Sequence, residues 1–277
     1  MVEIVAEVSC SHLGKLEHAL ALMDHAKWAG ADAVKFQLWM TPADLVGEGL
    51  ERTPLKSGAW EGKTLAELYR AAQTPPEWFP TLFDYAKQIN LPMFVSPFSL
   101  QAVEYLEARD CPRYKIASFE LNWLELIVRV AETNKPVVLS TGTCTKDEVA
   151  TALGCIPRRV PLTTLHCVSA YPTEIGQSNV NRMLRLPFPY GISDHSLGYI
   201  VPMTATALGA AMIEKHIMLP SREGLDSAHS LTPDEFRQMV NNVRGVEQAL
   251  GTGDWENEGE DRTFKRKLVN GEWVRAA

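Results

Sequence analysis

The sequence lacks the features of a membrane, secreted or nucleic-acid-binding protein. None of its apolar runs is long enough to span a bilayer, and the N-terminal segment MVEIVAEVS has neither the basic nor the apolar region of a signal peptide. The formal net charge is −7, so the composition provides no basic excess for binding nucleic acid. We therefore expect a cytoplasmic protein with no membrane partner and no nucleic-acid partner.

Cysteine is scarce, and its pattern excludes two kinds of small scaffold. The chain has five cysteines, an odd number, and no CxxC pair. Neither a disulfide framework nor a zinc knuckle is indicated, and a reducing compartment agrees with this pattern. With 277 residues, of which 45% are hydrophobic, the chain is long enough to bury a large core instead.

What the sequence does contain is a regular succession of short apolar runs. They are continuous rather than alternating, as expected for strands buried on both faces, and helix-like stretches separate most of them. The strand-like runs are residues 2–9, 33–37, 92–96, 114–118, 136–141, 162–167, 190–194 and 211–216. The helix-like stretches are residues 15–29, 65–72, 77–90, 100–109, 123–133, 145–154, 201–209 and 234–250. This order predicts an α/β fold, a (β/α)₈ TIM barrel, a domain that typically has roughly 250 residues.

Two segments fall outside this repeat. Residues 38–76 form a long insertion with one helical stretch, and loops of this length are usually functional. Its Trp39, Trp60 and Tyr69 either cover the barrel mouth as a lid or pack on the barrel exterior or a second subunit. The charged tail, residues 251–277, is expected to be a linker or arm that follows a catalytic domain of residues 1–250.

Nearly every strand-like run ends in a residue that can do chemistry, and strand ends line the active site of a TIM barrel. His195 and His216 end the seventh and eighth runs, which are neighbours in a closed barrel. Two imidazoles there predict a metal pair, with hydrogen-bonded structural histidines as the alternative. Asp226 and His229, in the loop that follows, are expected to add metal ligands or to contact substrate.

Lys35 and Lys115 end the second and fourth runs. Burying a lysine is costly unless it meets an anion, so this pair predicts an anion site. Glu7 and Glu120 lie at the same level and serve either as acid, base or sugar ligands or only as partners of the lysines. Hydroxyl groups around the same mouth suit a phosphate plus a carboxylate, or else cap the following helices. They belong to Ser96, Ser118, Ser140, Thr141 and Ser193.

A series of motifs carries a family resemblance. In order they are AEVSCSHLG, GADAVKFQ, FVSPFS, YKIASFE, LSTGT, LHCVSAYPT, GISDHSLG, IEKHIML, GLDSAHSLTPDEF and FKRKL. Over about residues 3–268 the chain resembles the N-acetylneuraminate (sialic acid) synthase family, which includes legionaminic and pseudaminic acid synthases. The resemblance implies that phosphoenolpyruvate condenses with the open-chain aldehyde of an N-acetylmannosamine-type sugar. The products would be a nine-carbon 2-keto sugar acid and phosphate.

The same resemblance implies a role for each strand-end residue. His195 and His216 would hold a divalent metal, usually manganese, with magnesium or cobalt as alternatives. Phosphoenolpyruvate would be bound by Lys35, Lys115, Ser96, Ser118, Ser140 and Ser193. The sugar would face Glu7, Gln37, Ser169, Tyr171 and Asp226. Glu120 would transfer a proton or position water, with Glu7 and Lys115 as further catalytic groups, and the protein would form a homodimer.

The sequence departs from the family pattern in two respects. Ser11 and Ser169 stand where the family commonly has asparagine, and Ser96 stands in place of a threonine, which leaves the identity of the sugar open. Family members usually continue into a small antifreeze-like domain that lends an arginine to the sugar site of the partner subunit. This sequence ends at Ala277, so we expect either a shortened protein or a barrel-only member.

Three other functions remain as alternatives. The first is a Schiff-base aldolase that uses Lys115 or Lys35. The second is a non-catalytic sugar-binding or assembly protein derived from the synthase family. The third is a relative that makes a smaller keto acid, such as a deoxy-octulosonate phosphate synthase.

Overall fold

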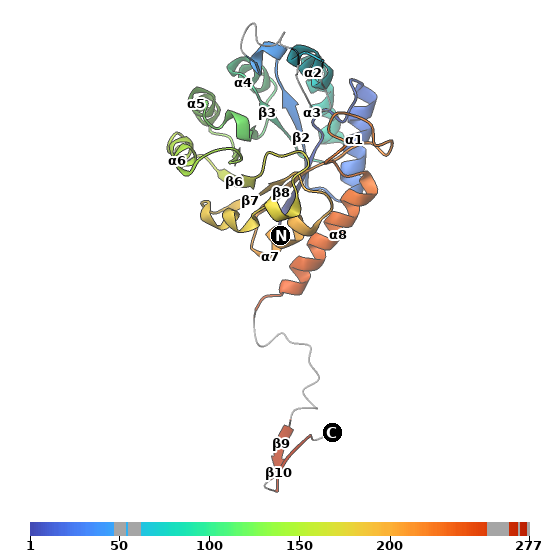
Figure 1. The fold of residues 1–277 in the computed structure, drawn as a ribbon, viewed down its shortest axis with the longest axis vertical. Coiled ribbons are helices and arrows are strands. Elements are labelled where there is room, and N and C mark those ends of the chain that lie inside the picture. Colours follow the sequence, from blue (N-terminus) through green and yellow to red (C-terminus); the bar gives the residue numbers. More distant parts are fainter. Residues whose placement is uncertain (47–53, 55–61, 254–265, 271, 276–277) are drawn as a thin grey trace.

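Eight parallel strands close into a barrel in the order β1 to β8, and helices surround it (Figure 1). The structure is a computed structural model that describes residues 1–46, 54, 62–253, 266–270 and 272–275. The barrel strands are β1 (Glu3–Glu7), β2 (Ala33–Leu38), β3 (Met93–Pro97), β4 (Tyr114–Ile116), β5 (Val137–Ser140), β6 (Leu162–Cys167), β7 (Tyr190–Asp194) and β8 (Met212–His216). The predicted TIM barrel is therefore confirmed. Strands β2 and β3 each extend one residue beyond the run expected from the sequence, and the other six lie within theirs.

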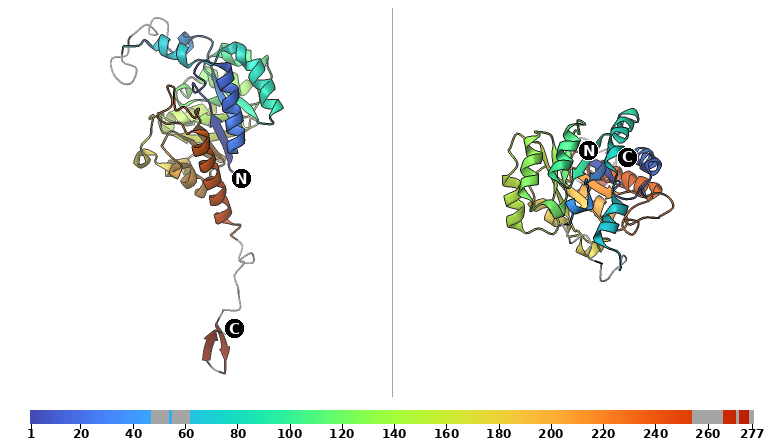
Figure 2. Two further views of the ribbon diagram at one scale, coloured as in Figure 1. Left: turned by 90° about the vertical axis from the view of Figure 1, so that its right-hand side faces the viewer. Right: turned by 90° about the horizontal axis from the view of Figure 1, so that it is seen from above.

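The helices also follow the predicted order. They are α1 (Leu16–Ala29), α2 (Leu65–Ala72), α3 (Phe79–Gln88), α4 (Leu100–Glu107), α5 (Leu124–Glu132), α6 (Lys146–Gly154), α7 (Ile200–Ala207) and α8 (Pro233–Leu250). Local chemistry sets several ends: Thr145 and Thr232 begin α6 and α8 with capping boxes, and Gly30 ends α1 at a φ of 89°. Helices α1 and α8 pack side by side, as the two views of Figure 2 show.

One connection departs from the helix-after-strand pattern. Between β6 and β7 the chain forms two 3-10 helices, η5 (Ile175–Gln177) and η6 (Val180–Arg185), where the sequence predicts a loop with some helical turn. Elsewhere among the described residues, 3-10 helices are η1 (Pro42–Asp44), η3 (Pro76–Trp78) and η4 (Ser118–Glu120). In the tail, β9 (Arg266–Val269) and β10 (Glu272–Arg275) pair as an antiparallel hairpin within the predicted arm.

The barrel interior is stacked in layers, and this stacking positions the candidate site. Six inward side chains form an apolar layer: Val5, Ala33, Phe94, Val138, Leu165 and Met212. Because side chains alternate along a strand, the residue two positions further along also points inward, one layer nearer the carboxyl ends. On the same six strands those residues are Glu7, Lys35, Ser96, Ser140, Cys167 and Glu214. The polar residues of the mouth therefore rest directly on an apolar layer.

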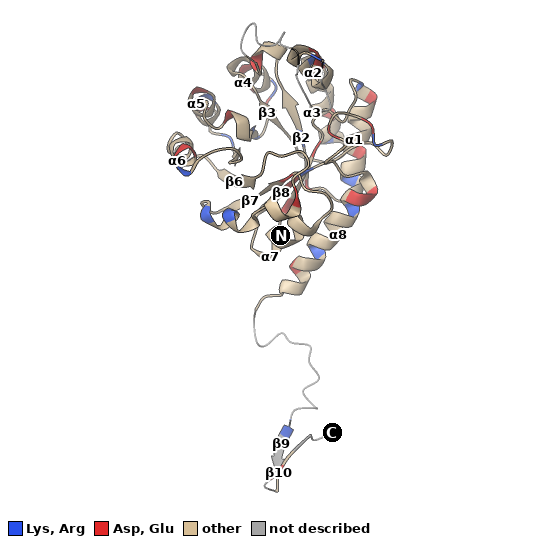
Figure 3. Cartoon of the chain, viewed as in Figure 1, with Lys and Arg blue, Asp and Glu red and all other residues tan. Residues whose placement is uncertain are grey.

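An ion pair lies at the opposite end of the barrel. The guanidinium of Arg113 donates to both carboxylate oxygens of Glu3, at 2.8 and 2.6 Å, and lies 4.1 Å from the centroid of the Phe94 ring. Outside the barrel, charges of both signs occur along α1 and α8 (Figure 3). Among the described residues, no helix combines the length and the apolar character that crossing a bilayer requires.

Candidate active site

Two lysines and two glutamates form a buried network in the barrel mouth. Lys35 Nζ lies 2.8 Å from Glu7 Oε2 and 3.6 Å from Glu214 Oε1. Lys115 Nζ donates to both carboxylate oxygens of Glu214 at 2.7 Å. All four side chains are at most 4% exposed. Two positive and two negative charges thus balance in a place where an uncompensated charge would be very costly.

The members of this network shift one another's pKa. Burial opposes ionisation of Glu214, but Lys115 and Lys35 outweigh it and hold the pKa of this carboxyl group well below its usual range. Burial also opposes the charge on Lys35, yet Glu214 and Glu7 raise the pKa of this ammonium. For Lys115, burial dominates, and the nearby Lys35 adds to it, so the pKa of Lys115 is lowered. Lys115 is therefore the more easily deprotonated of the two lysines.

The hydroxyl groups predicted around the mouth are present, and several contact the network. Ser96 Oγ accepts a hydrogen bond from Lys35 at 3.1 Å, and Ser193 Oγ donates to Glu214 Oε1 at 2.9 Å. Ser140 Oγ is buried without a hydrogen-bond partner among the described residues. Thr141 Oγ1 instead donates to the carbonyl oxygen of Leu165 at 3.1 Å, which is a structural role.

The loops after β4, β5 and β6 come together closely around Gly142. Its backbone N–H donates to Ser118 Oγ at 3.0 Å. A Cβ atom at this position would lie 2.6 Å from Ser169 Oγ and 2.8 Å from Ser118 Oγ, so any larger residue would displace these hydroxyl groups. The next residue, Thr143, has a φ of 59°, a conformation that is rare for a β-branched residue. The predicted ligands Ser118 and Ser169 are thus held together by a tight turn.

Three histidines and Asp226 meet at the β7–β8 side of the mouth. The ring centroids of His195 and His216 are 5.3 Å apart, and the ring of His229 lies 4.7 Å from that of His216 and 5.9 Å from that of His195. Asp226 Oδ2 lies 3.4 Å from His216 Nδ1, and Asp226 Oδ1 lies 3.9 Å from His229 Nε2. The structure therefore brings the predicted pair together and adds both residues of the loop after β8.

This group of side chains fits a divalent metal. One possible ligand atom from each of His216, Asp226 and His229 lies within 4.8 Å of the others. Nδ1 of His216, Nε2 of His229 and Oδ2 of Asp226 are buried without hydrogen-bond partners among the described residues. Burial, reinforced by His216, lowers the pKa of His229 to about 3, so its imidazole is neutral, as metal ligation requires.

The orientation of His195 fits the same role. Its Nδ1 lies 2.9 Å from the carbonyl oxygen of Val168. A carbonyl only accepts, so Nδ1 carries the proton and Nε2 keeps a free lone pair. Tyr171 packs against this ring at 4.3 Å between centroids and against the ring of His229 at 4.9 Å. The predicted sugar-facing Tyr171 therefore borders the histidine group directly.

Glu120 stands at the end of η4 as a buried carboxyl group. Its Oε2 has no hydrogen-bond partner among the described residues. Burial raises the pKa of Glu120 to about 7, although its own backbone N–H and the charges of Lys35 and Lys115 act in the opposite direction. A carboxyl group with a pKa near neutrality is suited to give or take a proton.

The other predicted sugar-facing residues, Glu7 and Gln37, contact each other. Gln37 Nε2 donates to Glu7 Oε1 at 2.8 Å, so Glu7 links the amide to Lys35. In the insertion, Trp39 is 4% exposed and packs edge-to-face on Tyr69 and Phe98, at 6.2 and 5.6 Å. Burial, and then the charge of Glu120, raises the pKa of Tyr69, which places Tyr69 near the mouth. Trp60 lies outside the described residues.

The sequence interpretation assigned no role to Glu214, which the structure places at the centre of the lysine–glutamate network. Its carboxylate contacts both Lys35 and Lys115. Glu214 lies within β8 rather than at its end, so the strand-end rule does not assign it a role. A signal was available, because Glu214 precedes His216 by two residues and must share its inward face. The residue between them, Lys215, points the other way and pairs with Asp194.

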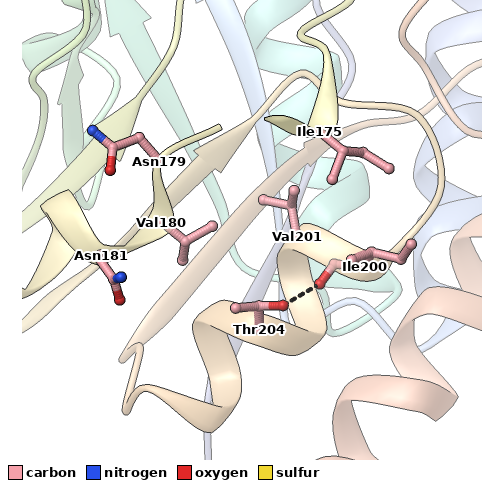
Figure 4. Close-up of a pocket in the computed structure, with 7 residues that line it drawn as sticks. All are labelled: Ile175, Asn179, Val180, Asn181, Ile200, Val201 and Thr204. Atoms are coloured by element: carbon pink, nitrogen blue, oxygen red, sulfur yellow. Dashed lines mark hydrogen bonds between the residues drawn. The ribbon is translucent and has the colours of Figure 1, made fainter. Parts of the chain in front are cut away.

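A separate pocket of about 270 Å³, with both polar and apolar side chains in its lining, lies beside η5, η6 and the start of α7 (Figure 4). The lining residues are Ile175, Asn179, Val180, Asn181, Ile200, Val201 and Thr204. None of them carries a charge, and none belongs to the lysine–glutamate network or the histidine group. This pocket is therefore distinct from the candidate site in the barrel mouth.

Comparison with known proteins agrees with this geometry. The NeuB family model matches residues 22–255. The chain is 40% identical to a pseudaminic acid synthase of Campylobacter jejuni, over 96% of this chain and 81% of the relative. It is 32% identical to the N,N'-diacetyllegionaminic acid synthase of Legionella pneumophila, over 91% of this chain and 74% of that relative. The crystal structure of an N-acetylneuraminic acid synthetase from Leptospira borgpetersenii in complex with citrate superposes with a TM-score of 0.83 at 30% identity, covering 93% of this chain and 88% of that one. The resemblance inferred from the motifs is confirmed: this chain belongs to the NeuB family.

Proposed function

We propose that this protein is a sugar acid synthase that condenses phosphoenolpyruvate with an N-acylated amino-sugar aldehyde. The products are a nine-carbon 2-keto sugar acid and phosphate. The observation that carries the proposal is the pair of buried lysines, Lys35 and Lys115, beside the histidine group in one barrel mouth. The first group suits an enol phosphate and the second suits a polarised aldehyde, so both substrates of the condensation have a place.

The lysine–glutamate network binds phosphoenolpyruvate in this proposal. Lys35 and Lys115 are fixed ammonium groups, so they stabilise negative charge without having to reorganise. The hydroxyl of Ser140, buried without a partner among the described residues, is available for the phosphate or carboxylate. The turn at Gly142 fixes Ser118, whose hydroxyl accepts a hydrogen bond from the backbone N–H of Gly142. The carbon–carbon bond forms between C3 of phosphoenolpyruvate and the aldehyde carbon, and water adds at C2.

Protein groups also manage the protons. Glu120, whose pKa lies near neutrality, gives or accepts a proton at the enol phosphate or positions the attacking water. Gln37 and Glu7 form a hydrogen-bonded pair that faces the sugar hydroxyls, together with Asp226, Tyr171 and Ser169. Phosphate then leaves with cleavage of the C–O bond of the enol phosphate.

His195 and His216 hold a divalent metal in this proposal, with Asp226 and His229 beside them. When bound, the metal supplies Lewis-acid polarisation of the aldehyde oxygen. Burial keeps the imidazole of His229 neutral, and the carbonyl oxygen of Val168 fixes the ring of His195. Manganese is the metal we propose, with magnesium or cobalt as alternatives. A homodimer remains a prediction from the family resemblance, and a cytoplasmic location remains a prediction from the sequence.

The sugar is proposed to be of the type used for pseudaminic acid. The identity of 40% with a pseudaminic acid synthase exceeds the 32% with a legionaminic acid synthase, which favours the former. Mass spectrometry of reactions with phosphoenolpyruvate, manganese and a panel of acylated amino sugars tests both the reaction and the sugar. Exhaustive chelation should abolish product formation while the circular dichroism spectrum is retained, and manganese should restore it. A product formed at the full rate after chelation, or by His216→Ala, would contradict the metal role.

A Schiff-base aldolase is the second candidate, because the pKa of Lys115 is lowered, as a nucleophilic lysine requires. Glu214 opposes this role, because both of its carboxylate oxygens accept hydrogen bonds from Lys115 and stabilise the ammonium form. Borohydride trapping with pyruvate separates the two functions. A covalent adduct at Lys115 supports the aldolase, and chelator-sensitive consumption of phosphoenolpyruvate without an adduct supports the synthase.

A further inference from the structure

Asp194 and Lys215 form the most deeply buried ion pair among the described residues. The two are register partners across β7 and β8, and Lys215 Nζ lies 2.7 Å from Asp194 Oδ2. Their side chains are 2% and 0% exposed. Because neighbouring side chains on a strand alternate, this pair faces the helices while Ser193 and Glu214 face the barrel interior. The pair therefore takes no part in the lysine–glutamate network of the mouth.

The same pair binds both backbone groups of Ser196. The backbone N–H of Ser196 donates to Asp194 Oδ1 at 2.9 Å, and Lys215 Nζ donates to the backbone carbonyl oxygen of Ser196. His195 lies between Asp194 and Ser196, so the backbone is held on both of its sides. His216 directly follows Lys215. One buried contact thus joins the residues that flank His195 to the residue that precedes His216.

Other contacts of His195 do not replace this one. The hydrogen bond from Nδ1 to Val168 sets the rotation of the ring. The backbone N–H of Thr173 donates to the carbonyl oxygen of His195 at 3.0 Å, which ties His195 to the loop after β6 rather than to β8. Asp194 and Lys215 instead connect the turn at Ser196 to β8.

Stability does not account for such a pair. Removing two charges from water costs about as much as their attraction returns, and apolar residues of similar volume are often neutral or stabilising in their place. What an ion pair adds is a defined geometry between two chain segments. Here the segments carry His195 and His216, whose rings lie 5.3 Å apart.

We propose that Asp194 and Lys215 are positioning residues for the metal centre: they set the spacing of His195 and His216 and thereby the affinity for the metal. This inference rests on the proposed metal role of the two histidines. Groups that orient metal ligands without touching the metal typically change metal affinity by about 10- to 100-fold when they are removed.

The test uses the double variant Asp194→Asn/Lys215→Met with manganese alone as the probe. Asparagine keeps an acceptor for the N–H of Ser196, and methionine keeps most of the lysine chain, so both charges leave while the shape is largely retained. Binding is measured by the electron paramagnetic resonance signal of free manganese, and folding by the thermal unfolding midpoint. Glu3→Gln/Arg113→Met, which removes an ion pair at the opposite end of the barrel, is the matched control.

We expect the double variant to bind manganese at least 10-fold more weakly than wild type, the lower end of the effect expected for such groups. The control should bind as wild type does, and the KM for phosphoenolpyruvate should change little in either. Manganese affinity within twofold of wild type in the folded double variant overturns the inference alone. Absence of manganese binding by wild type overturns the metal site, and the inference with it.

A second variant decides the matter if the double variant does not fold. Lys215→Arg keeps the charge but replaces a compact ammonium with a larger planar group. If the pair acts through geometry, Lys215→Arg still weakens manganese binding. If charge alone is needed, Lys215→Arg binds manganese normally, and that result overturns the positioning role.

Discussion

The substitution Glu214→Gln tests the electrostatic design of the mouth most directly. Glu214 is the shared partner of Lys115, at 2.7 Å from both oxygens, and of Lys35, at 3.6 Å. Glutamine keeps the shape but removes the charge. The mouth then contains two ammonium groups and a single carboxylate, that of Glu7, and carries an excess positive charge.

The size of the effect follows from these distances. At an effective dielectric constant of about 20, two unit charges 2.7 Å apart attract by about 6 kcal/mol. Part of this is returned because a neutral amide is less costly to bury than a carboxylate. Breaking a buried pair from one side costs about 3–5 kcal/mol in measured cases, and we expect a loss of unfolding free energy in this range for Glu214→Gln.

The excess positive charge should also make the stability of the Glu214→Gln variant depend on its anionic substrate. Phosphoenolpyruvate brings negative charge to the lysines, and a ligand that binds only the folded state stabilises by about 2.7 kcal/mol at 100 times its Kd. Chemical denaturation with and without phosphoenolpyruvate measures both effects. Glu104→Gln, on the exposed face of α4, is the control and should change neither value.

The pH dependence supplies an independent check. The folded-state pKa of Glu214 lies below the unfolded value of 4.5, so its contribution to stability is complete above about pH 4.5. That contribution is lost as the pH falls through the folded pKa. The stability difference between wild type and Glu214→Gln should therefore be constant near neutrality and shrink only in acid. A difference below 1 kcal/mol at pH 7, or one that grows in acid, would refute the reasoning.

Three further substitutions test single groups in the mouth. Glu120→Gln should lower turnover by on the order of 10²-fold, because it removes the proton-transfer group, and near-normal kcat would contradict this role. The same variant should be more stable than wild type at pH 8, because the folded carboxyl, with a pKa of about 7, no longer has to ionise in a buried place. Lys115→Ala should weaken phosphoenolpyruvate binding by roughly 2 kcal/mol in calorimetry, and unchanged affinity would remove Lys115 from the site. Gly142→Ala should raise the KM for phosphoenolpyruvate, because the added Cβ pushes Ser118 and Ser169 apart, and an unchanged KM would show that this turn is not part of the site.

The sequence predicts the barrel and most of the mouth for one physical reason. Strands buried on both faces leave polar residues only where they end, so each polar residue after an apolar run marks the active end of the barrel. Lys35, Lys115 and His216 were found in this way, and the structure brings them into one mouth. The precise contacts were not predictable, because they depend on which strands are neighbours and on the register between them.

Residues outside this rule were harder to predict. Glu214 lies inside β8 rather than after it, so only its two-residue spacing from His216 indicates an inward side chain. Asp226 and His229 lie in the long loop after β8, and no spacing rule states that such a loop folds back onto His216. The insertion was ambiguous for a similar reason. Trp39 is buried against Phe98, whereas the charge of Glu120 reaches Tyr69.

The neutrality of the lysine–glutamate network has a consequence for the acid in the mouth. Before substrate binds, the charges of Lys35 and Lys115 lower the pKa of Glu120, and burial raises it more strongly, to about 7. An anion that binds the two lysines cancels their effect and adds negative charge near the carboxyl group, so the pKa of Glu120 should rise further. Binding of phosphoenolpyruvate would thus help Glu120 to keep its proton until it is needed.

The pH profiles of two kinetic constants test this shift. The profile of kcat/KM reports the pKa of Glu120 in the free enzyme, and the profile of kcat reports its pKa in the enzyme with substrate bound. The alkaline limb of the kcat profile should therefore lie at higher pH than that of the kcat/KM profile. Steady-state kinetics from pH 5 to 10 would measure both, with Glu120→Gln as the variant that should lose the limb. A kcat limb at or below that of kcat/KM, or a limb that persists in Glu120→Gln, would show that another group carries this proton.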